Sequence, residues 1–224
     1  MGVITAMEEE LNAIKSKLSN IQEISIFDIV FYKGIKSEKK YILCKSGVGK
    51  VNSARTAQIL ADNFKLDYIV NIGSAGALND NLQIGDIVIG KNLVQHDFDI
   101  TAFGHEKGYI TDTGKIFKSD LSLINKYEGY IKNNNLQYRG VIGTIASGDI
   151  FCTNVDMKNK IKQKFNADCV EMEGAAIAQV CTLNNIPFLG IRSISDTPNG
   201  NNQIDFNKFL ELASERCATL LTQI

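Results

Sequence analysis

The chain has 224 residues, of which 44% are hydrophobic, and a formal net charge of −1 at pH 7. This length suits one packed domain spanning residues 1–224, and the charge gives no general attraction to nucleic acid or to an anionic membrane. The sequence also has no apolar run long enough to span a membrane and no basic-then-apolar leader. We therefore expect neither a nucleic-acid partner nor a membrane partner. Five cysteines without a C-x-x-C pair predict a cytoplasmic protein with reduced thiols. With only two histidines we expect no histidine-rich metal site, and no cofactor.

The chain begins with a predicted short strand at 2–5, followed by a helix from about Ala6. The apolar stripe of this helix consists of Met7, Leu11, Ile14 and Leu18. Glu9 points away from the stripe, whereas Glu10 is the glutamate nearest to it. The plain alternative is a solvated first turn in which all three glutamates are favoured by the helix dipole.

A hairpin and a second helix come next. Residues 29–32 and 40–44 are strand-like and are separated by a polar turn. Residues 46–50 predict a tight turn from strand to helix, because their glycine spacing is not that of a phosphate-binding P-loop. The helix expected at about 51–64 is rich in alanine. Its predicted buried residues are Val51, Ala54, Leu60 and Ala61.

The middle of the chain contains a candidate ligand-binding turn. Residues 67–72 predict a buried strand that runs into the small residues 73–76, where glycine would let a ligand approach the backbone closely. A plain turn is the competing interpretation. Another strand is expected at 84–90 and a loop with exposed apolar side chains at 94–104, whereas 105–118 fit no regular element.

The C-terminal half continues the alternation of helices and strands. Residues 119–133 predict an exposed helix, 140–146 a strand, and 156–164 a lysine-rich surface helix. Asp205 caps a final helix. Its apolar stripe is Phe206, Phe209, Leu210, Ala213, Cys217, Leu220 and Leu221. This alternation predicts an α/β fold with a central mixed β-sheet flanked by helices and a site at one end of the sheet.

Two stretches place charges in apolar surroundings. Glu171 and Glu173 stand at the start of an almost wholly apolar helix, which would normally be buried. If both lie on that helix, only one can face a given pocket; two anions in a dipole-stabilised first turn are the alternative. Residues 187–196 predict a buried strand ending at Asp196, with Arg192 four residues earlier, and open α/β sheets bind ligands at such strand ends.

Seven motifs occur in register from the first residues to the last helix. They are AMEEE (6–10), SGVGK (46–50), GSAG (73–76), DITAFG (99–104), SGD (147–149), VEME (170–173) and SISD (193–196). Together they resemble the 5′-methylthioadenosine/S-adenosylhomocysteine nucleosidases of the nucleoside phosphorylase superfamily. The resemblance implies a three-layer sandwich that cleaves adenine from both nucleosides with water, in methionine salvage. The departure lies in 105–118, where the family often has a proline and this chain has none.

The resemblance also assigns catalytic roles. Asp196 is implied to protonate adenine N7, Glu173 to hold the ribose hydroxyls, and Glu10 to deprotonate the attacking water. General acids and bases typically accelerate a reaction by ~10² to 10⁴-fold each. Glycoside hydrolysis by two carboxylates uses the same principle. The residues implied to assist them are Ser195 beside Asp196, the Met172 backbone beside Glu173, and Ser74 and Arg192 near Glu10.

The remaining substrate-binding residues follow from the same resemblance. Phe151 is implied to stack on the purine, and the Cys152 backbone to read its edge. An apolar pocket for the 5′ substituent is implied by Met7, Val48, Met172 and Phe206. Ile100 and Phe103 would reach into that pocket from a second subunit, so we expect a homodimer.

Three alternatives stay open. A purine nucleoside phosphorylase would clamp phosphate, a task that favours several arginines, and of the four arginines only Arg192 lies on a motif; backbone amides also bind phosphate, however. Hydrolysis of 6-amino-6-deoxyfutalosine, an activity of some relatives, is not excluded by these residues. A non-catalytic nucleoside-binding protein would have no need of Glu10, Glu173 and Asp196 together.

Overall fold

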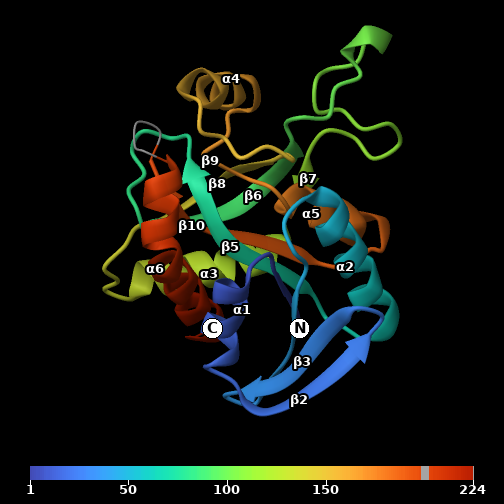
Figure 1. Ribbon diagram of the computed structural model, residues 1–224, viewed down its shortest axis with the longest axis vertical. Helices are drawn as coiled ribbons and strands as arrows, with labels where there is room; N and C mark the ends of the chain where they lie inside the picture. Colours follow the sequence, from blue (N-terminus) through green and yellow to red (C-terminus); the bar gives the residue numbers. More distant parts are fainter. Residues whose placement is uncertain (198–201, 224) are drawn as a thin grey trace.

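The structure is a computed structural model that describes residues 1–197 and 202–223 (Figure 1). The strands are β1 (Gly2–Thr5), β2 (Ser19–Ile26), β3 (Ile29–Lys36), β4 (Lys39–Lys45), β5 (Ile69–Ala77), β6 (Ile87–Gln95), β7 (Phe117–Lys118), β8 (Gly140–Ser147), β9 (Cys169–Glu171) and β10 (Phe188–Asp196). The helices are α1 (Glu8–Lys15), α2 (Lys50–Asn63), α3 (Leu121–Asn133), α4 (Val155–Phe165), α5 (Gly174–Leu183) and α6 (Asn202–Gln223), with a 3-10 helix η1 at Thr101–Phe103.

All the described strands belong to one mixed sheet, which closes on itself around β10. β10 pairs in parallel with β5 and antiparallel with β6. β6 continues through β8 and β9 back to β5. From β5 the sheet extends outward through β1, β4, β3 and β2. Every residue of β10 is buried, so the strand that carries Arg192 and Asp196 is supported on both edges.

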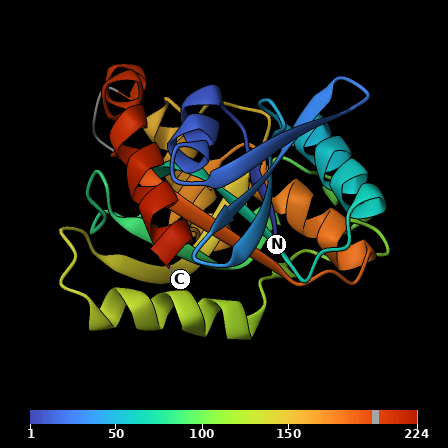
Figure 2. The same ribbon diagram turned by 90° about the horizontal axis from the view of Figure 1, so that it is seen from below.

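Helices cover both faces of the sheet. Along β5, Ile69, Ala75 and Ala77 pack in a core with α2 and α5, whereas Val70 and Ile72 pack in a second core with α1, α3 and α6. Figure 2 shows α6 (red) on the left and α2 and α5 (teal and orange) together on the right, with strands between them. The α/β fold with a mixed sheet flanked by helices is therefore confirmed. Within residues 1–197 and 202–223, no helix combines the length and the apolar character that crossing a membrane requires.

Some element boundaries differ from the sequence-based expectation. β5 runs to Ala77 because β10 and β9 pair with its second half, so residues 73–76 are strand and not loop. β6 likewise continues to Gln95. Val51 is 78% exposed and not buried, because α2 packs through other positions of its first turns. The buried residues of α2 are Ser53, Thr56, Ala57 and Leu60.

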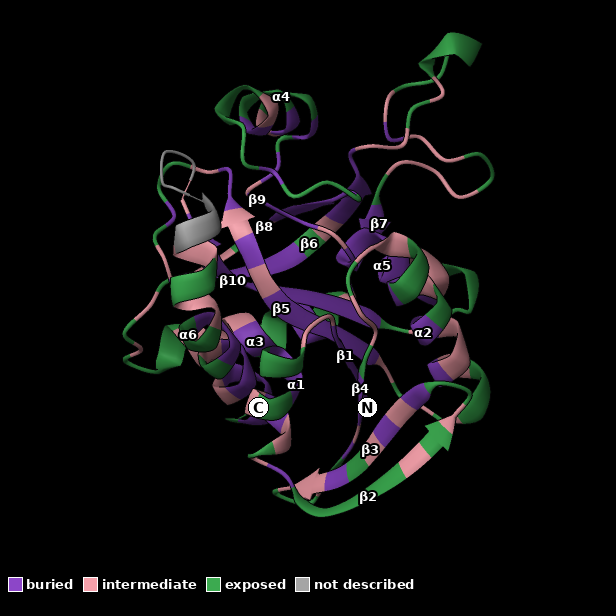
Figure 3. Ribbon diagram, in the orientation of Figure 1, coloured by how far each residue is buried: buried purple, intermediate pink, exposed green. Residues whose placement is uncertain are grey.

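Two further differences concern the surface and the last helix. The hairpin of β3 and β4 was predicted, but β2, which pairs with β3, was not, because most of its residues are exposed and its apolar alternation is limited to Ile24 and Ile26 (Figure 3). α6 begins at Asn202, so Asp205 lies inside its first turn and does not cap it. Between β6 and β7, the segment that carries η1 projects away from the body of the molecule (Figure 1).

Candidate active site

A cavity of about 560 Å³ opens where β1, β5, β9 and β10 meet. All the site residues predicted from the sequence line it except Ile100 and Phe103. The residues that line it come from seven separate parts of the chain, among them the start of α1, the second half of β5 and the end of β10. The sheet therefore brings distant motifs together at one place.

Glu10 is held inside this cavity by four hydrogen bonds. Its Oε2 accepts from the backbone amides of Ala6 and Met7 at 3.0 and 3.1 Å. Its Oε1 accepts from the amide and the hydroxyl of Ser74 at 3.0 and 3.3 Å. Burial raises the pKa of Glu10, and the Ser74 amide and the Arg192 charge oppose that shift. Glu9 is exposed, as its position on the helix predicts.

Two glycines of β5 make room for carboxylates of the protein itself. A Cβ atom at Gly73 would lie 2.6 Å from Oε1 of Glu10, and one at Gly76 would lie 2.9 Å from Oδ2 of Asp196. Neither approach is sterically tolerable, so a side chain at either position would displace a carboxylate. From the sequence we expected these glycines to let a ligand approach the backbone; both do line the cavity, and in addition they make room for Glu10 and Asp196.

Glu171 and Glu173 do not share a helix. Glu171 ends β9, whereas Glu173 occupies the position just before α5 and makes no side-chain capping hydrogen bond. Burial alone would raise the pKa of Glu171, but the guanidinium of Arg192, 2.5 Å away, holds that pKa below its usual value. Oε1 of Glu173 accepts from the Gly49 amide at 2.8 Å, and burial together with the Glu171 charge raises the pKa of Glu173 to about 8. The pKa values of these two carboxyl groups, only two residues apart, are thus shifted in opposite directions.

Asp196 lies at the end of β10 and is 2% exposed. Its Oδ1 accepts from the Ser195 hydroxyl at 3.1 Å, and its Oδ2 accepts from Nζ of Lys158 at 2.9 Å. Burial raises the pKa of Asp196, and the Lys158 charge opposes that shift. Lys158 belongs to α4, which was expected to be a surface helix. Its spacing from Ile161 and Phe165, three and seven residues on, places it on the buried stripe and could have revealed it.

Arg192 is more constrained than the sequence indicated. It lines the cavity, but its guanidinium donates to the backbone and side-chain oxygens of Asn71 and to Glu171. Ser147, which also donates to Glu171, belongs to the same group. These partners were missed, although a polar residue in the apolar strand at 67–72 was a signal for Asn71. Arg192 therefore anchors the floor of the cavity.

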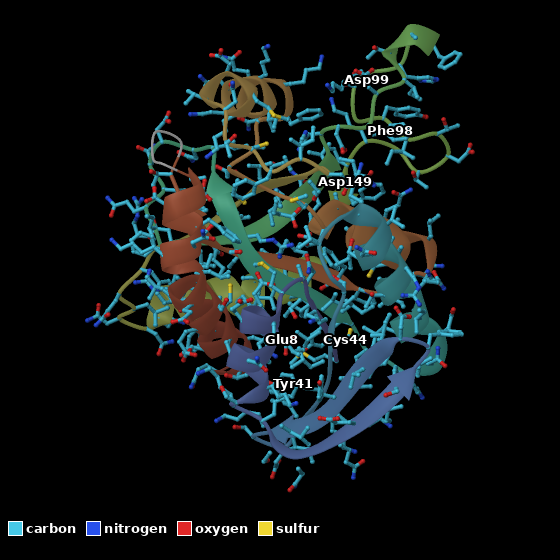
Figure 4. All side chains as sticks on the ribbon, in the orientation of Figure 1. Glu8, Tyr41, Cys44, Phe98, Asp99 and Asp149 are labelled. Atoms are coloured by element: carbon cyan, nitrogen blue, oxygen red, sulfur yellow. The ribbon has the colours of Figure 1, made fainter. Side chains whose placement is uncertain are left out.

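Apolar residues surround the mouth of the cavity. Phe151 is 44% exposed and meets Phe206 edge to face, with ring centroids 5.6 Å apart. Phe103, in η1, is 80% exposed and, like Ile100, does not belong to the described lining of its own chain's cavity. Figure 4 shows the neighbouring Asp99 on the segment that projects from the body. The predicted contribution of this segment to a partner's pocket stays a prediction.

The arrangement is suited to proton transfer. Glu10, Glu173 and Asp196 all line one cavity, and burial moves the pKa of each upward, toward neutral pH. Groups tuned in this way serve as general acids and bases. In the described part of the chain, no three His, Cys, Asp or Glu side chains are grouped as metal ligands would be.

Comparison with known proteins identifies the family. Residues 1–224 match the phosphorylase superfamily. A 5′-methylthioadenosine/S-adenosylhomocysteine nucleosidase of Staphylococcus aureus (strain bovine RF122 / ET3-1) is 43% identical over 215 residues, which cover 96% of this chain and 93% of the relative. The solved structure of the S. pneumoniae nucleosidase with a transition-state inhibitor has a TM-score of 0.93 at 38% identity, covering 99% of this chain and 96% of that one. Futalosine hydrolase of Helicobacter pylori has a TM-score of 0.92 at 33% identity, covering 98% and 94%. The chain therefore belongs to the 5′-methylthioadenosine/S-adenosylhomocysteine nucleosidase family of the phosphorylase superfamily.

Proposed function

We propose that this protein hydrolyses the N-glycosidic bond of 5′-methylthioadenosine and S-adenosylhomocysteine, releasing adenine and the 5-thioribose product. The observation that carries the proposal is the convergence of Glu10, Glu173 and Asp196 on one cavity, each held by different donors. The names of the relatives point to the same substrates. A non-catalytic nucleoside-binding protein would gain nothing from three buried carboxylates with raised pKa values, because each costs desolvation energy.

The two ends of the scissile bond need opposite proton transfers. Asp196 gives a proton to adenine N7, so that the C1′–N9 bond breaks with its electron pair moving to the purine. Glu10 takes a proton from the water that attacks C1′, and its four donors fix the direction in which it does so. The ribose gains positive charge as the bond breaks. Glu173, beside the sugar, binds its hydroxyls and stabilises this charge when ionised.

Water, and not phosphate, is the proposed nucleophile because the arginines are engaged elsewhere. Arg192 is bound to Glu171 and Asn71. The other three each have a partner: Arg55 pairs with Asp28, Arg139 with Asp86, and Arg216 lies over the ring of Tyr138. A phosphate clamp would require at least one of these guanidinium groups to change partners.

Product analysis tests the proposal. Methylthioadenosine should release adenine at a rate independent of phosphate, with free 5-methylthioribose as the second product. Glu10→Gln should reduce turnover at least ~100-fold, as expected for loss of a general base. The matched control is Glu9→Gln on the exposed side of α1, which should turn over normally. A ribose 1-phosphate product would instead establish a phosphorylase.

A second candidate activity, hydrolysis of 6-amino-6-deoxyfutalosine, is favoured by one observation. A futalosine hydrolase has nearly the same fold over 98% of this chain. The same assay distinguishes the two, because adenine release from each nucleoside gives separate kcat/KM values. We expect methylthioadenosine and S-adenosylhomocysteine to be the better substrates. A role in methionine salvage follows if they are, and the five free, buried cysteines support a cytoplasmic location.

The homodimer is part of the proposal. Phe103 and Val51 are 80% and 78% exposed, and Val48 and Phe151 at the cavity mouth are also exposed. Large exposed apolar side chains that lie together on a surface usually mark an interface, and the proposal is that these four residues form one in the dimer. Phe103→Ala should therefore raise KM for methylthioadenosine by about 10-fold, near the lower estimate for burying one large side chain. The same variant should weaken the binding of adenine by less. Sedimentation at micromolar concentration should show a dimer, and a fully active monomer would contradict the assignment.

A further inference from the structure

A buried lysine lies behind the proposed general acid. α4 carries lysines at 158, 160, 162 and 164, and Lys158 is the one that is 1% exposed. Its Nζ lies 2.9 Å from Oδ2 of Asp196 and 3.5 Å from the carbonyl oxygen of Thr197. Asp196 lines the cavity, whereas Lys158 is not among the described lining residues, so it reaches the carboxyl group from the side away from the substrate.

A buried ammonium group is costly in free energy unless a partner compensates its charge. The structure places this one against the carboxyl group that must lose a proton during the reaction. An ammonium stabilises a carboxylate far more than a neutral carboxylic acid, so its interaction with Asp196 strengthens as the proton leaves. Only interactions that strengthen toward the transition state accelerate the chemical step.

We propose that Lys158 is a positioning residue for Asp196: it fixes the carboxyl group at the purine end of the cavity and stabilises the carboxylate that remains after proton transfer. This inference rests on the proposed function. One proton moves from Asp196 to N7, and the electron pair of the C1′–N9 bond moves to the purine. Lys158 keeps its three protons, so the step ends with an ammonium–carboxylate pair.

The other groups around Asp196 set the direction of the pH effect. Burial raises its pKa, Lys158 from α4 and the Ser195 hydroxyl from β10 lower it, and Asp205 from α6 raises it. The Cys152 thiol in the loop after β8 has a pKa raised to about 11 by its own burial and is neutral at the pH of the assay. Removing the Lys158 charge should therefore raise the pKa of Asp196, making it a weaker acid that stays protonated to higher pH.

The test compares Lys158→Met, which keeps the unbranched shape without the charge, with Lys160→Met on the exposed side of the same helix. Loss of a charge-stabilising donor in contact with the reacting group lowers kcat by ~10² to 10³-fold. For a group acting through Asp196 we expect about 10-fold lower kcat near neutral pH, with little change in KM. The alkaline limb of kcat/KM should move to higher pH, so that the deficit shrinks as pH rises. Lys158→Arg should recover part of the rate, and Lys160→Met should match the wild type.

Two readouts separate this inference from the proposed function. Absence of adenine release by the wild type would refute the function. The carboxyl ¹³C titration of Asp196, followed by NMR in folded wild type and Lys158→Met, tests the coupling without turnover. An unshifted titration, or an unchanged rate and pH profile in Lys158→Met, would overturn the role of Lys158. If Lys158→Met does not fold, Lys158→Arg carries the test. Because this variant keeps the positive charge, a partly recovered or full rate with an alkaline limb close to that of the wild type supports the coupling. A fully lost rate in the folded variant, or an alkaline limb moved to higher pH despite the retained charge, contradicts it.

Discussion

Two buried ion pairs adjoin the cavity, and the pKa of the carboxyl group is lowered in one pair and raised in the other. In the Arg192–Glu171 pair the charged atoms are 2.5 Å apart, and Glu171 also accepts hydrogen bonds from two backbone amides and a serine hydroxyl. In the Lys158–Asp196 pair they are 2.9 Å apart, and one serine hydroxyl completes the contacts that we have described for the carboxyl group. All four side chains are 2–3% exposed, so burial does not distinguish the pairs.

The difference lies in how many donors surround the carboxylate. With several donors and a guanidinium that also binds Asn71, the pKa of Glu171 falls despite its burial. With fewer donors, the pKa of Asp196 rises. A planar guanidinium fixes several acceptors at once, whereas an ammonium acts as a point charge. The first pair is therefore built to hold the floor of the cavity, and the second leaves a carboxyl group able to exchange a proton.

Breaking the Arg192–Glu171 pair should have the largest effect. Arg192→Leu leaves Glu171 buried without its cation, which typically costs about 3–5 kcal/mol of unfolding free energy. Denaturant unfolding followed by circular dichroism measures this loss. Arg192→Lys keeps the charge but not the planar fork, and we expect it to recover only part of the stability. Unfolding of Arg192→Leu at the wild-type midpoint would show that the pair is not a structural anchor.

Changing the acid of the second pair should affect turnover more than folding. Asp196→Asn keeps the shape and an oxygen that accepts from Lys158, but it removes the transferable proton. We expect kcat to fall at least ~100-fold, the low end for general acid catalysis, with the circular dichroism spectrum unchanged. Steady-state assays with methylthioadenosine decide the matter, because near-normal turnover would remove Asp196 from its role.

Glu173 extends the comparison of Glu171 and Asp196 to a carboxyl group whose described hydrogen-bond donor is a backbone amide and not a cation. Its pKa is about 8 in the folded protein against a usual 4.5, so between these values the folded state holds a proton that the unfolded state has released. This contribution to stability is complete below 4.5 and is lost as pH rises toward 8, by at most about 1.4 kcal/mol per pH unit. In Glu173→Gln the group does not titrate, so the variant should gain on the wild type as pH rises. Parallel stability curves, measured by unfolding at several pH values, would contradict this.

The sequence predicted the positions of the acids better than their partners. Glu10 was selected from three glutamates by the resemblance, since helix geometry placed it only slightly nearer the apolar stripe, and Asp196 was indicated by its place at the end of an apolar strand. Their partners depend on which segments the fold brings together. Gly49 meets Glu173 across 124 residues, and Arg192 meets Asn71 across 121, so no local spacing indicates either contact.

The errors in the predicted secondary structure and burial also arise from contacts between segments that are distant in the sequence. The small residues at 73–76 have a local preference for a turn, but pairing with β9 and β10 keeps them extended. Val51 is apolar yet exposed, because the buried side of α2 consists of Ser53, Thr56, Ala57 and Leu60. On β2 only Ile24 and Ile26 are half-buried, so its pairing with β3 left too short an apolar alternation in the sequence to indicate a strand.

The double pairing of β10 has a consequence for motion. Its backbone is hydrogen-bonded to a neighbour on each edge and all its residues are buried. Amide hydrogens in such a strand exchange with solvent only through large-scale opening, whereas exposed segments exchange through local fluctuations. The slowest-exchanging amides should therefore include those of β10, and the fastest those of the segment around η1. The acid on β10 would then keep its position from one turnover to the next, while the segment around η1 fluctuates independently of it.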